Sequence, residues 1–203
     1  MELTSVAQWL NDTFYAFDEA VFRAFHDLAV SAGGVLTPLT QAVSWTGWKG
    51  AFLILAALVL IIFKKTRRTG ICALLAIAFG GLLTNILVKN LVARPRPYTW
   101  QEFQDWWNYV GAAMESDFCF PSGHVTVTTD FMTAVVLTRG KKWAPVAVVY
   151  ILVMAFSRVY LIVHYTTDVI GGFVFGLVAG CLSFLIVRAV YKRFGETRLL
   201  RDT

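Results

Sequence analysis

The chain of 203 residues has the length of one domain, and its 57% hydrophobic and 15% charged residues are typical of a membrane protein and not of a soluble one. The formal net charge of +5 does not indicate nucleic-acid binding, because the charges fall in short clusters between apolar segments. The three cysteines show no CxxC pair and no His/Cys ligand spacing, so we expect neither a disulfide framework nor a structural zinc site.

Residues 1–44 are expected to form an N-terminal arm before the first membrane span. No secretory signal peptide is expected, because the first fifteen residues lack a basic start and a continuous apolar stretch. Further along, apolar residues recur at three- and four-residue steps with polar residues opposite, which predicts an amphipathic helix in the membrane interface. We expect His26 to be solvated and not catalytic. The apolar positions are Phe14, Phe17, Val21, Ala24, Phe25 and Leu28, and the polar ones are Asp18, Glu19, Arg23, His26 and Asp27.

Five apolar segments follow, and they predict an all-α integral membrane fold, a bundle of about five transmembrane helices over residues 45–191. Four segments approach the ~20 residues that a helix needs to cross a membrane. The third is shorter, is rich in threonine and contains Asp130, so it reaches a spanning length only if its helix begins near Ser122. The segments run approximately from Trp45 to Phe63, Gly70 to Val92, Val125 to Thr138, Trp143 to Val163 and Val169 to Val190.

The connections between these segments alternate in charge, which sets the expected orientation. Basic clusters lie at 64–68, 139–142 and 192–201, whereas the arm and the loop of residues 94–120 carry most of the acidic residues. Since basic loops stay in the cytoplasm, we expect the N-terminus and the 94–120 loop outside, and the basic tail of residues 192–203 in the cytoplasm. The protein is thus expected to be a multi-pass protein of the cell (plasma) membrane.

The loop after the second segment is rich in aromatic residues, which allows two interpretations. They could form an aromatic belt that anchors the loop at the level of the lipid headgroups, or a wall that guides a headgroup. We favour anchoring alone. The residues are Trp100, Phe103, Trp106, Trp107 and Tyr109.

Three short motifs stand in one order along the chain and supply three cations, two histidines and a carboxylate. All adjoin apolar segments and fall at their expected outer ends. Ionised side chains at membrane depth cost about 2.5–3.5 kcal/mol each on insertion scales, so they are rarely there without a task. Two histidines, an acid and several cations are what phosphoryl transfer through a histidine nucleophile needs. The motifs are Lys89-x6-Arg96-Pro97, Pro121-Ser122-Gly123-His124 and Ser157-Arg158-x5-His164-x3-Asp168.

In these motifs the chain resembles the type 2 phosphatidic acid phosphatase family of integral membrane lipid phosphatases, which shares its site with vanadium haloperoxidases. The resemblance runs from about Lys89 to Asp168 and continues through the last apolar segment, but it does not reach the first forty or so residues. Many family members have six spans, so a chain with five spans and an outside N-terminus departs from that pattern. The spans exclude a soluble haloperoxidase.

A phosphate monoester carries up to two negative charges, and we expect Lys89, Arg96 and Arg158 to offset them. Arginine offers a planar fork for phosphate oxygens, and lysine a point charge. Lys89 and Arg96 could instead be interfacial cations at helix ends, whereas Arg158 is expected about five residues inside its span and needs a buried anion or a wet cavity. Arg94 has no position in the family motif and is expected to be a solvated interfacial charge.

The second and third motifs supply the expected catalytic groups. Ser122 can cap a helix whose free N–H groups bind phosphate, and Gly123 lets the backbone approach closely. His164 and Asp168 are four residues apart and would face each other in a helix, so the carboxylate would fix the imidazole tautomer and favour its charged form. The resemblance implies that His164 attacks phosphorus and becomes phosphohistidine, and that His124 protonates the leaving alcohol and then activates water. No metal or other cofactor is expected, since three cations already offset the phosphate charge.

Two further polar residues lie within the predicted spans. Asn85 is one turn before Lys89 and could brace it. Asp130 lies six residues after His124 and matches no family motif. A partner for a threonine or arginine in the bundle and a residue of the cavity are equally favoured interpretations of Asp130.

We therefore expect an outward-facing lipid phosphate phosphatase. An anion transporter or channel is a weaker alternative, because it leaves the His164–Asp168 pair without a function. A phosphotransferase that passes the phosphoryl group or headgroup to a lipid acceptor stays open, since water and an alcohol need the same site. Phosphatidic acid, phosphatidylglycerol phosphate and undecaprenyl diphosphate all remain candidate substrates, with the outward site favouring the last. Apart from this lipid and the bilayer, no obligate protein partner is expected.

Overall fold

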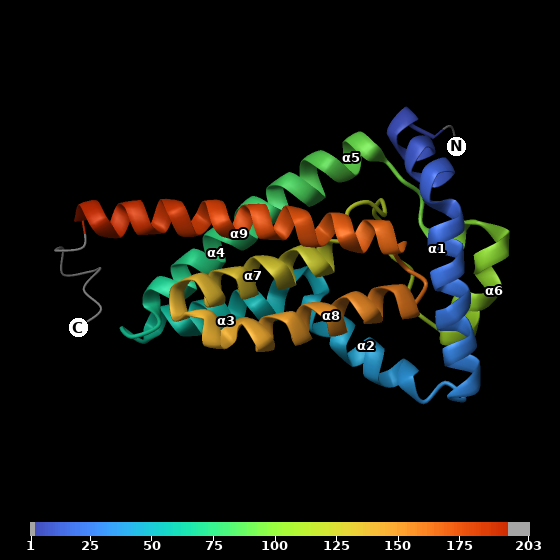
Figure 1. Ribbon diagram of the computed structural model, residues 1–203, viewed down its shortest axis with the longest axis horizontal. Helices are drawn as coiled ribbons and strands as arrows, with labels where there is room; N and C mark the ends of the chain where they lie inside the picture. Colours follow the sequence, from blue (N-terminus) through green and yellow to red (C-terminus); the bar gives the residue numbers. More distant parts are fainter. Residues whose placement is uncertain (1–2, 195–203) are drawn as a thin grey trace.

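The computed structural model describes residues 3–194, and every regular element within them is a helix. The expected all-α fold is therefore confirmed. The end of the predicted basic tail, with Arg198 and Arg201, lies outside the described residues. In chain order the helices, with the short 3₁₀ and π segments marked η, are α1 Ser5–Ser31, α2 Leu36–Gly47, η1 Trp48–Gly50, α3 Ala51–Ile62, α4 Arg67–Gly81, η2 Leu82–Val88, α5 Lys89–Val92, η3 Pro97–Thr99, α6 Gln101–Val110, α7 Gly123–Arg139, η4 Lys141–Trp143, α8 Ala144–Tyr160 and α9 Thr166–Phe194 (Figure 1).

Helices α2 to α5 and α7 to α9 form an elongated bundle, and α7 lies at its centre against α4, α8 and α9 (Figure 1). α7 has 17 residues and is the third predicted span; it begins directly after Ser122, as its length required. Together with four longer helical stretches it makes a multi-pass membrane protein of about five spans. Within the described part, the stretches that are long and apolar enough to cross a membrane are Leu36–Ile62, Arg67–Thr99, Lys141–Tyr160 and Thr166–Phe194.

Burial between helices explains why α7 can be rich in threonine. Two of its buried hydroxyls are turned back onto the helix: Thr126 Oγ1 donates to the carbonyl of Ser122 at 2.9 Å, and Thr128 Oγ1 to that of His124 at 2.8 Å. On the facing helix α9, glycines let the two backbones come close. A Cβ at Gly176 would lie 2.7 Å from the carbonyl oxygen of Thr126 and from Cβ of Thr129. Small residues at such contacts are what close helix packing in membranes requires.

The first span begins earlier than predicted, because α2 starts at Leu36 and the arm ends near residue 35 instead of 44. Its hydroxyl residues dilute the apolar pattern, yet they fit a helix: Thr40 Oγ1 donates to the carbonyl of Thr37 at 2.8 Å. The span is broken at η1, where Lys49 and Gly50 have φ angles of 49° and 69°. Polar groups satisfied within the helix therefore hid its first half from the sequence pattern.

The second span is one continuous helical stretch made of α4, η2 and α5. η2 is a π-helical segment of seven residues, and such segments are frequent at functional sites. The helix ends at Ala93, whose φ of 50° turns the chain into the following loop. Lys89 lies in its last turn, so the helix carries this cation to the end of the bundle.

The N-terminal arm is a helix, α1, that lies across one end of the bundle beside α6 (Figure 1). Its buried face differs from the predicted one, because Phe17 is 47% exposed whereas Asp18 is only 2% exposed. His26 is also not simply solvated, since its ring stacks on Trp106 of α6 with the centroids 5.0 Å apart. The arm therefore packs on protein, with a charged residue turned inward.

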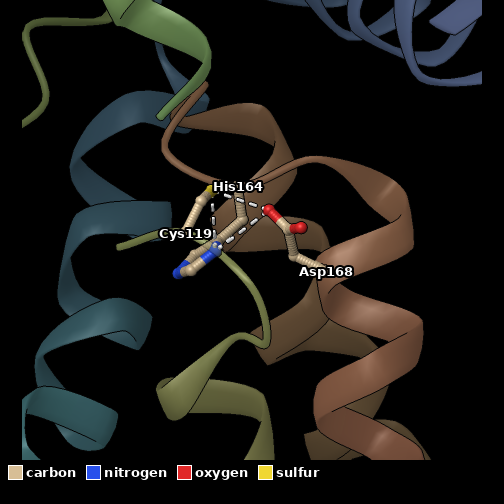
Figure 2. Close-up of side chains that lie close together, drawn as sticks. All are labelled: Cys119, His164 and Asp168. Atoms are coloured by element: carbon tan, nitrogen blue, oxygen red, sulfur yellow. Dashed lines mark hydrogen bonds and ion pairs between the residues drawn. The ribbon is translucent and has the colours of Figure 1, made fainter. Parts of the chain in front are cut away.

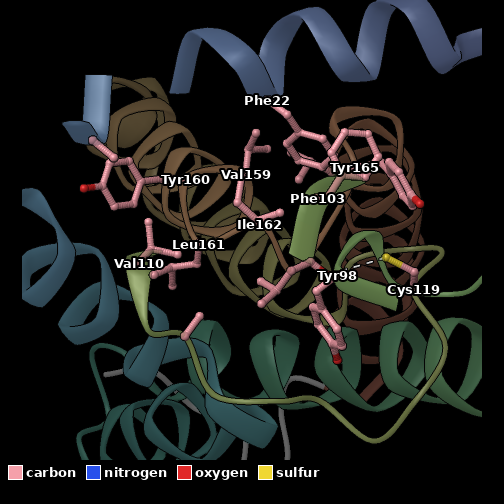
Figure 3. Packing of buried hydrophobic residues seen from close by; sticks show 14 of the residues in the cluster. Phe22, Tyr98, Phe103, Val110, Cys119, Val159, Tyr160, Leu161, Ile162 and Tyr165 are labelled. Carbon is pink, nitrogen blue, oxygen red and sulfur yellow. Dashed lines mark hydrogen bonds between the residues drawn. The ribbon is translucent and has the colours of Figure 1, made fainter. Parts of the chain in front are cut away.

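Aromatic side chains tie this arm to the bundle. Phe22 of α1 packs against Phe103 of α6 and Tyr165 before α9, with ring centroids 5.2 and 5.6 Å apart (Figure 3). In the same loop, Trp100 and Tyr109 are 39% and 47% exposed. The aromatic loop thus divides into a buried part that holds α1 and an exposed part for which lipid anchoring stays a prediction.

Candidate active site

The three motifs meet at the end of the bundle that α1 covers. α5 brings Lys89, the start of α7 brings His124, and the turn between α8 and α9 brings His164. A cavity of about 450 Å³ lies among these residues. Arg158, near the end of α8, lines an adjoining cavity of about 420 Å³ that shares His124 with the first. The first cavity is also lined by Asn85, Arg96, Glu115, Asp117, Gly123 and Asp130.

Each of the three predicted phosphate-binding cations is buried and holds a carboxylate from the loop before α7. Nζ of Lys89 bonds to Oδ2 of Asp117, and Nη2 of Arg96 donates to Oδ1 of the same residue at 2.5 Å. Nη2 of Arg158 donates to Oε1 of Glu115 at 2.5 Å. The cations are only 4%, 4% and 2% exposed, so they do not snorkel to water. Carboxylate and phosphate oxygens bind the same donors, so the arrangement can hold a phosphate.

Arg96 also orients His164. Its Nη1 donates to the carbonyl of Val163 at 2.8 Å and lies 2.9 Å from Nε2 of His164. A guanidinium can only donate, so Nε2 accepts with its lone pair and the ring proton is assigned to Nδ1. Burial, followed by the charges of Arg96 and Arg158, holds the pKa of His164 well below its ordinary value. The expected effect of Asp168 in favour of the charged imidazole is thus outweighed by burial and by these cations.

His164 precedes α9, so a loop-to-helix turn and not a helix brings it to Asp168. Nδ1 of His164 lies 3.5 Å from Oδ2 of Asp168, and the backbone N–H of Tyr165 donates to the same oxygen at 3.0 Å. Cys119 joins the pair, with Sγ donating to Oδ2 at 2.7 Å and lying 3.5 Å from Nδ1 (Figure 2). A single loop cysteine gives no signal in the sequence, so Cys119 was not foreseen here.

Among residues 3–194, Cys119, His164 and Asp168 form a group that could in principle bind a metal ion. Each offers one ligand atom, and the three atoms lie within 4.8 Å of one another. The carboxylate is already paired, because Arg94 donates to its Oδ1 at 2.7 Å. A second guanidinium, that of Arg96, lies against the imidazole. Two fixed cations disfavour a metal ion by like-charge repulsion, so this donor set does not fit a divalent metal.

The start of α7 differs from the prediction in one respect. Ser122 occupies the N-cap position, but its side chain makes no cap bond, and its buried Oγ has no partner among the described residues. Its N–H donates to the carbonyl of Asp168 at 3.0 Å and so ties α7 to α9. A Cβ on Gly123 would lie 2.9 Å from Oδ1 of Asn85, so the missing side chain leaves room for that amide.

His124 and Asp130 of α7 both line the first cavity. His124 is 9% exposed, and a Cβ on Gly47 would lie 2.7 Å from its Cδ2, so the break in the first span packs against it. Asp130 lines the inner end of the same cavity, and neither of its oxygens has a partner in the part of the chain that is described. Gly80 makes room for it, since a Cβ there would collide with the carboxylate. These contacts favour the cavity residue over the bundle partner.

Arg94 was predicted to be a solvated charge, and this prediction is wrong. It is 1% exposed, and it donates to Oδ1 of Asp168 at 2.7 Å and to Oδ2 of Asp18 at 3.2 Å. Its guanidinium also lies 3.8 Å from the ring centroid of Tyr165. Nothing in the sequence shows that the arm returns to this point, so the partner Asp18 was missed as well.

Comparison with known proteins gives one consistent result. A family model described as the PAP2 superfamily matches residues 69–192. The phosphatidylglycerophosphatase B of Bacillus subtilis is 32% identical over 190 residues, which cover 85% of this chain and 86% of that protein. An undecaprenyl-diphosphatase of Sulfolobus acidocaldarius is 29% identical over 129 residues, 64% of this chain and 59% of that protein, so the chain spans less than two thirds of this relative.

Two solved structures share the fold. The transmembrane PAP2-type phosphatidylglycerolphosphate phosphatase from Bacillus subtilis superposes with a TM-score of 0.69 at 25% identity, over 95% of this chain and 94% of that one. LpxE of Aquifex aeolicus superposes with a TM-score of 0.63 at 21% identity, over 82% and 93% of the two chains. At this identity, the likeness to LpxE shows a common fold alone.

Proposed function

Because this chain belongs to the PAP2 superfamily of membrane phosphatases, we propose that it hydrolyses the terminal phosphate of a lipid phosphomonoester or diphosphate. Family membership confirms the phosphatase class expected from the motifs. The observation that carries the proposal is the position of Nε2 of His164, whose lone pair faces Arg96 inside a group of buried cations. A nucleophile set into an anion site supports phosphoryl transfer over anion transport.

In the proposed reaction, Nε2 of His164 attacks phosphorus, and the P–N bond forms as the bond to the leaving oxygen breaks. His124 donates a proton to that oxygen. Water then attacks the phosphohistidine, His124 accepts its proton, and the P–N bond breaks to release inorganic phosphate. Lys89, Arg96 and Arg158 hold the non-bridging oxygens, where charge stabilisation lowers the barrier.

The remaining predicted residues support this chemistry. Asp168 faces Nδ1 and stabilises the positive charge that the imidazole carries while it is phosphorylated. The backbone N–H of Gly123 stands at the start of α7, where the helix dipole favours an anion. The N–H of Ser122 is bonded to the carbonyl of Asp168, so Ser122 would bind phosphate through its Oγ, which is unpartnered within the described residues. We assign no metal to the reaction, because the fixed cations supply the positive charge.

The substrate is proposed to lie in the outer leaflet of the plasma membrane. The basic clusters at 64–68 and 139–142 support a cytoplasmic position for the end of the bundle opposite the site, together with the C-terminus. Among the relatives are proteins named for undecaprenyl diphosphate and for phosphatidylglycerophosphate. Of these lipids, an outward site favours undecaprenyl diphosphate.

Phosphate release by the purified protein from phosphatidic acid, phosphatidylglycerol phosphate and undecaprenyl diphosphate tests the proposal. We expect the highest kcat/KM on the diphosphate, and loss of release in His164→Ala by orders of magnitude with an unchanged Tm. Near wild-type release by His164→Ala would refute the mechanism. Phosphate recovered on an added lipid alcohol, and not as the free ion, would identify a phosphotransferase instead.

The proposed role of His124 as general acid can be tested with substrates that differ in their leaving group. The proton of His124 matters for a lipid alcohol but hardly for p-nitrophenol, which leaves as a stable anion. His124→Ala is therefore expected to lose far more activity on the lipid substrate than on p-nitrophenyl phosphate. An equal loss on both would mean that His124 binds phosphate or activates water and is not the general acid.

A further inference from the structure

A buried ion cluster lies directly behind the proposed catalytic pair and joins three distant parts of the chain. Asp18 of α1, Arg94 after α5 and Asp168 of α9 are 2%, 1% and 0% exposed. Thr167 binds Asp18 twice, through its N–H at 3.1 Å and its hydroxyl at 2.8 Å. Nε of Arg94 donates to Oδ1 of Asn11 at 2.8 Å. The cluster thus fixes the guanidinium from both sides.

We propose that Arg94 and Asp18 are positioning residues of the reaction: Arg94 fixes the orientation of the Asp168 carboxylate, and Asp18 offsets the charge of Arg94. The inference rests on the proposed function, in which His164 is the nucleophile. It extends the active site to the N-terminal arm, which lies outside the residues that the family model matches.

The orientation of the Asp168 carboxylate depends on how its two oxygens are bound. Arg94 binds Oδ1 at 2.7 Å, which leaves Oδ2 turned toward Nδ1 of His164. The Cys119 thiol and the Tyr165 N–H both donate to this Oδ2, so both oxygens of the carboxylate are bound. A carboxylate bound at one oxygen only could rotate, and a misplacement of about 1 Å at a reacting group can cost roughly 100-fold in rate.

The net charge of the cluster gives a reason for the second buried acid, Asp18. Phosphorylation at Nε2 leaves a positive charge on the imidazole, which Asp168 stabilises. Arg94 alone would cancel the charge of Asp168 and weaken that effect. With Asp18 bound to Arg94, the cluster of one cation and two carboxylates keeps a net charge of −1 beside the imidazole. Burying an unpaired charge is costly, so Asp18 and Arg94 also stabilise each other.

The test uses Arg94→Gln, Asp18→Asn and Arg94→Lys in the full-length protein, with one lipid substrate for all. We expect Arg94→Gln and Asp18→Asn to lower kcat roughly 10- to 100-fold while KM changes little, because the phosphate cations are untouched. Arg94→Lys keeps the positive charge but loses the planar guanidinium, so its kcat is expected to lie between those of Arg94→Gln and the wild type.

The pH dependence of kcat/KM separates positioning from a structural effect. Its acid limb, where activity falls as the pH is lowered, reports the pKa of the nucleophile His164 in the free enzyme. Loss of the Arg94 cation raises the pKa of His164, so Arg94→Gln is expected to move the limb to higher pH. Loss of the Asp18 anion lowers that pKa, so Asp18→Asn is expected to move it to lower pH. Arg94→Lys leaves the limb in place. The other ionisable groups that face His164 stay constant in all variants, namely Lys89, Arg96, Cys119, His124, Arg158 and Asp168.

Arg23→Gln and Asp27→Asn are the matched controls, because both alter exposed charges of α1 outside the cluster. They are expected to leave kcat and the limb unchanged. Limbs of Arg94→Gln and Asp18→Asn that stay in place, or that shift in the same direction, would overturn the inference. If Arg94→Gln does not fold, Asp18→Asn decides by the shift of its limb to lower pH, and Arg94→Lys by a lowered kcat with an unchanged limb. Activity retained in His164→Ala would refute the proposed function itself, whereas an inactive His164→Ala with fully active Arg94 and Asp18 variants would refute only this inference.

Discussion

His164 shows how burial sets the chemistry of a single residue. Its sequence spacing to Asp168 favours an imidazolium, but the folded environment places Arg96 against Nε2 and excludes water from the ring. The imidazole is thereby kept neutral, which is the form that can attack phosphorus. In the proposed reaction, the partner carboxylate orients the ring and stabilises its phosphorylated state.

A pH titration of His164 by NMR of selectively labelled histidines tests this directly. The lowered pKa means that the ring stays neutral as the pH falls through about 6.5, the ordinary value, and becomes charged only below it. The signal is assigned by its absence in His164→Gln. A midpoint at or above the ordinary value would contradict the expected neutral nucleophile.

Asp117 forms ion pairs with Lys89 and Arg96, two of the cations that the proposal assigns to phosphate. Burial alone would raise the pKa of this carboxyl, but Lys89 and Arg96 outweigh it and the pKa is lowered. The carboxylate therefore stays charged at neutral pH, and under the proposed function it would compete with an incoming phosphate. Its side chain is 49% exposed, so solvent weakens the pairing.

Asp117→Asn is accordingly expected to strengthen inhibition by inorganic phosphate. Removing a competitor whose pairing contributes about 1 kcal/mol would lower the inhibition constant roughly fivefold. Asp105→Asn, an exposed acid of α6, is the matched control and is expected to show no change. An unchanged inhibition constant in Asp117→Asn would mean that phosphate does not displace this carboxylate.

At the level of helices, the contact between α7 and α9 holds the site together. His124 stands at the start of α7 and His164 and Asp168 at the start of α9, so the spacing of the two helices sets the distance between the proposed acid and nucleophile. Glycines of α9 set that spacing. The threonine-rich sequence of α7 is thus a packing feature of a buried span.

Gly176→Ala tests this contact. The added Cβ would lie 2.7 Å from backbone and side-chain atoms of α7, so we expect a destabilisation of about 1–3 kcal/mol, read as a lower Tm in detergent. Gly81→Ala is the control, because a Cβ there meets nothing within 4 Å. An equal Tm for both variants would show that the two helices separate without cost.

For the whole molecule, the structure places the candidate site and α1 at one end of the bundle, and the basic connections before α4 and α8 at the other (Figure 1). This polarity agrees with the loop charges. It leads to the proposal that the site faces outward, where an outer-leaflet lipid can reach it.

Labelling of introduced cysteines in intact cells tests the orientation. In a Cys181→Ser background, a reagent that does not cross membranes is expected to modify Asp105→Cys but not Lys65→Cys. Both positions are exposed, and the two other native cysteines are buried. The reverse pattern would place the site in the cytoplasm and remove the argument for an outer-leaflet substrate.

The sequence by itself determined the parts of this protein that depend on local composition. Apolar segments of spanning length predict the helices, and cations and histidines at their ends are conspicuous because charge is costly in a membrane. Those residues, from Lys89 to His164, do come together in the structure around one pair of cavities.

Only the tertiary structure decided the partners of these charges. Asp18 and Arg94 are separated by two membrane spans, and Cys119, Glu115 and Asp117 lie in a loop without periodicity. Periodicity reports which face of a helix is apolar, but not which distant group will be buried beside it. That depends on how α1 and the loop before α7 fold over the end of the bundle, where each buried charge must find its counter-ion.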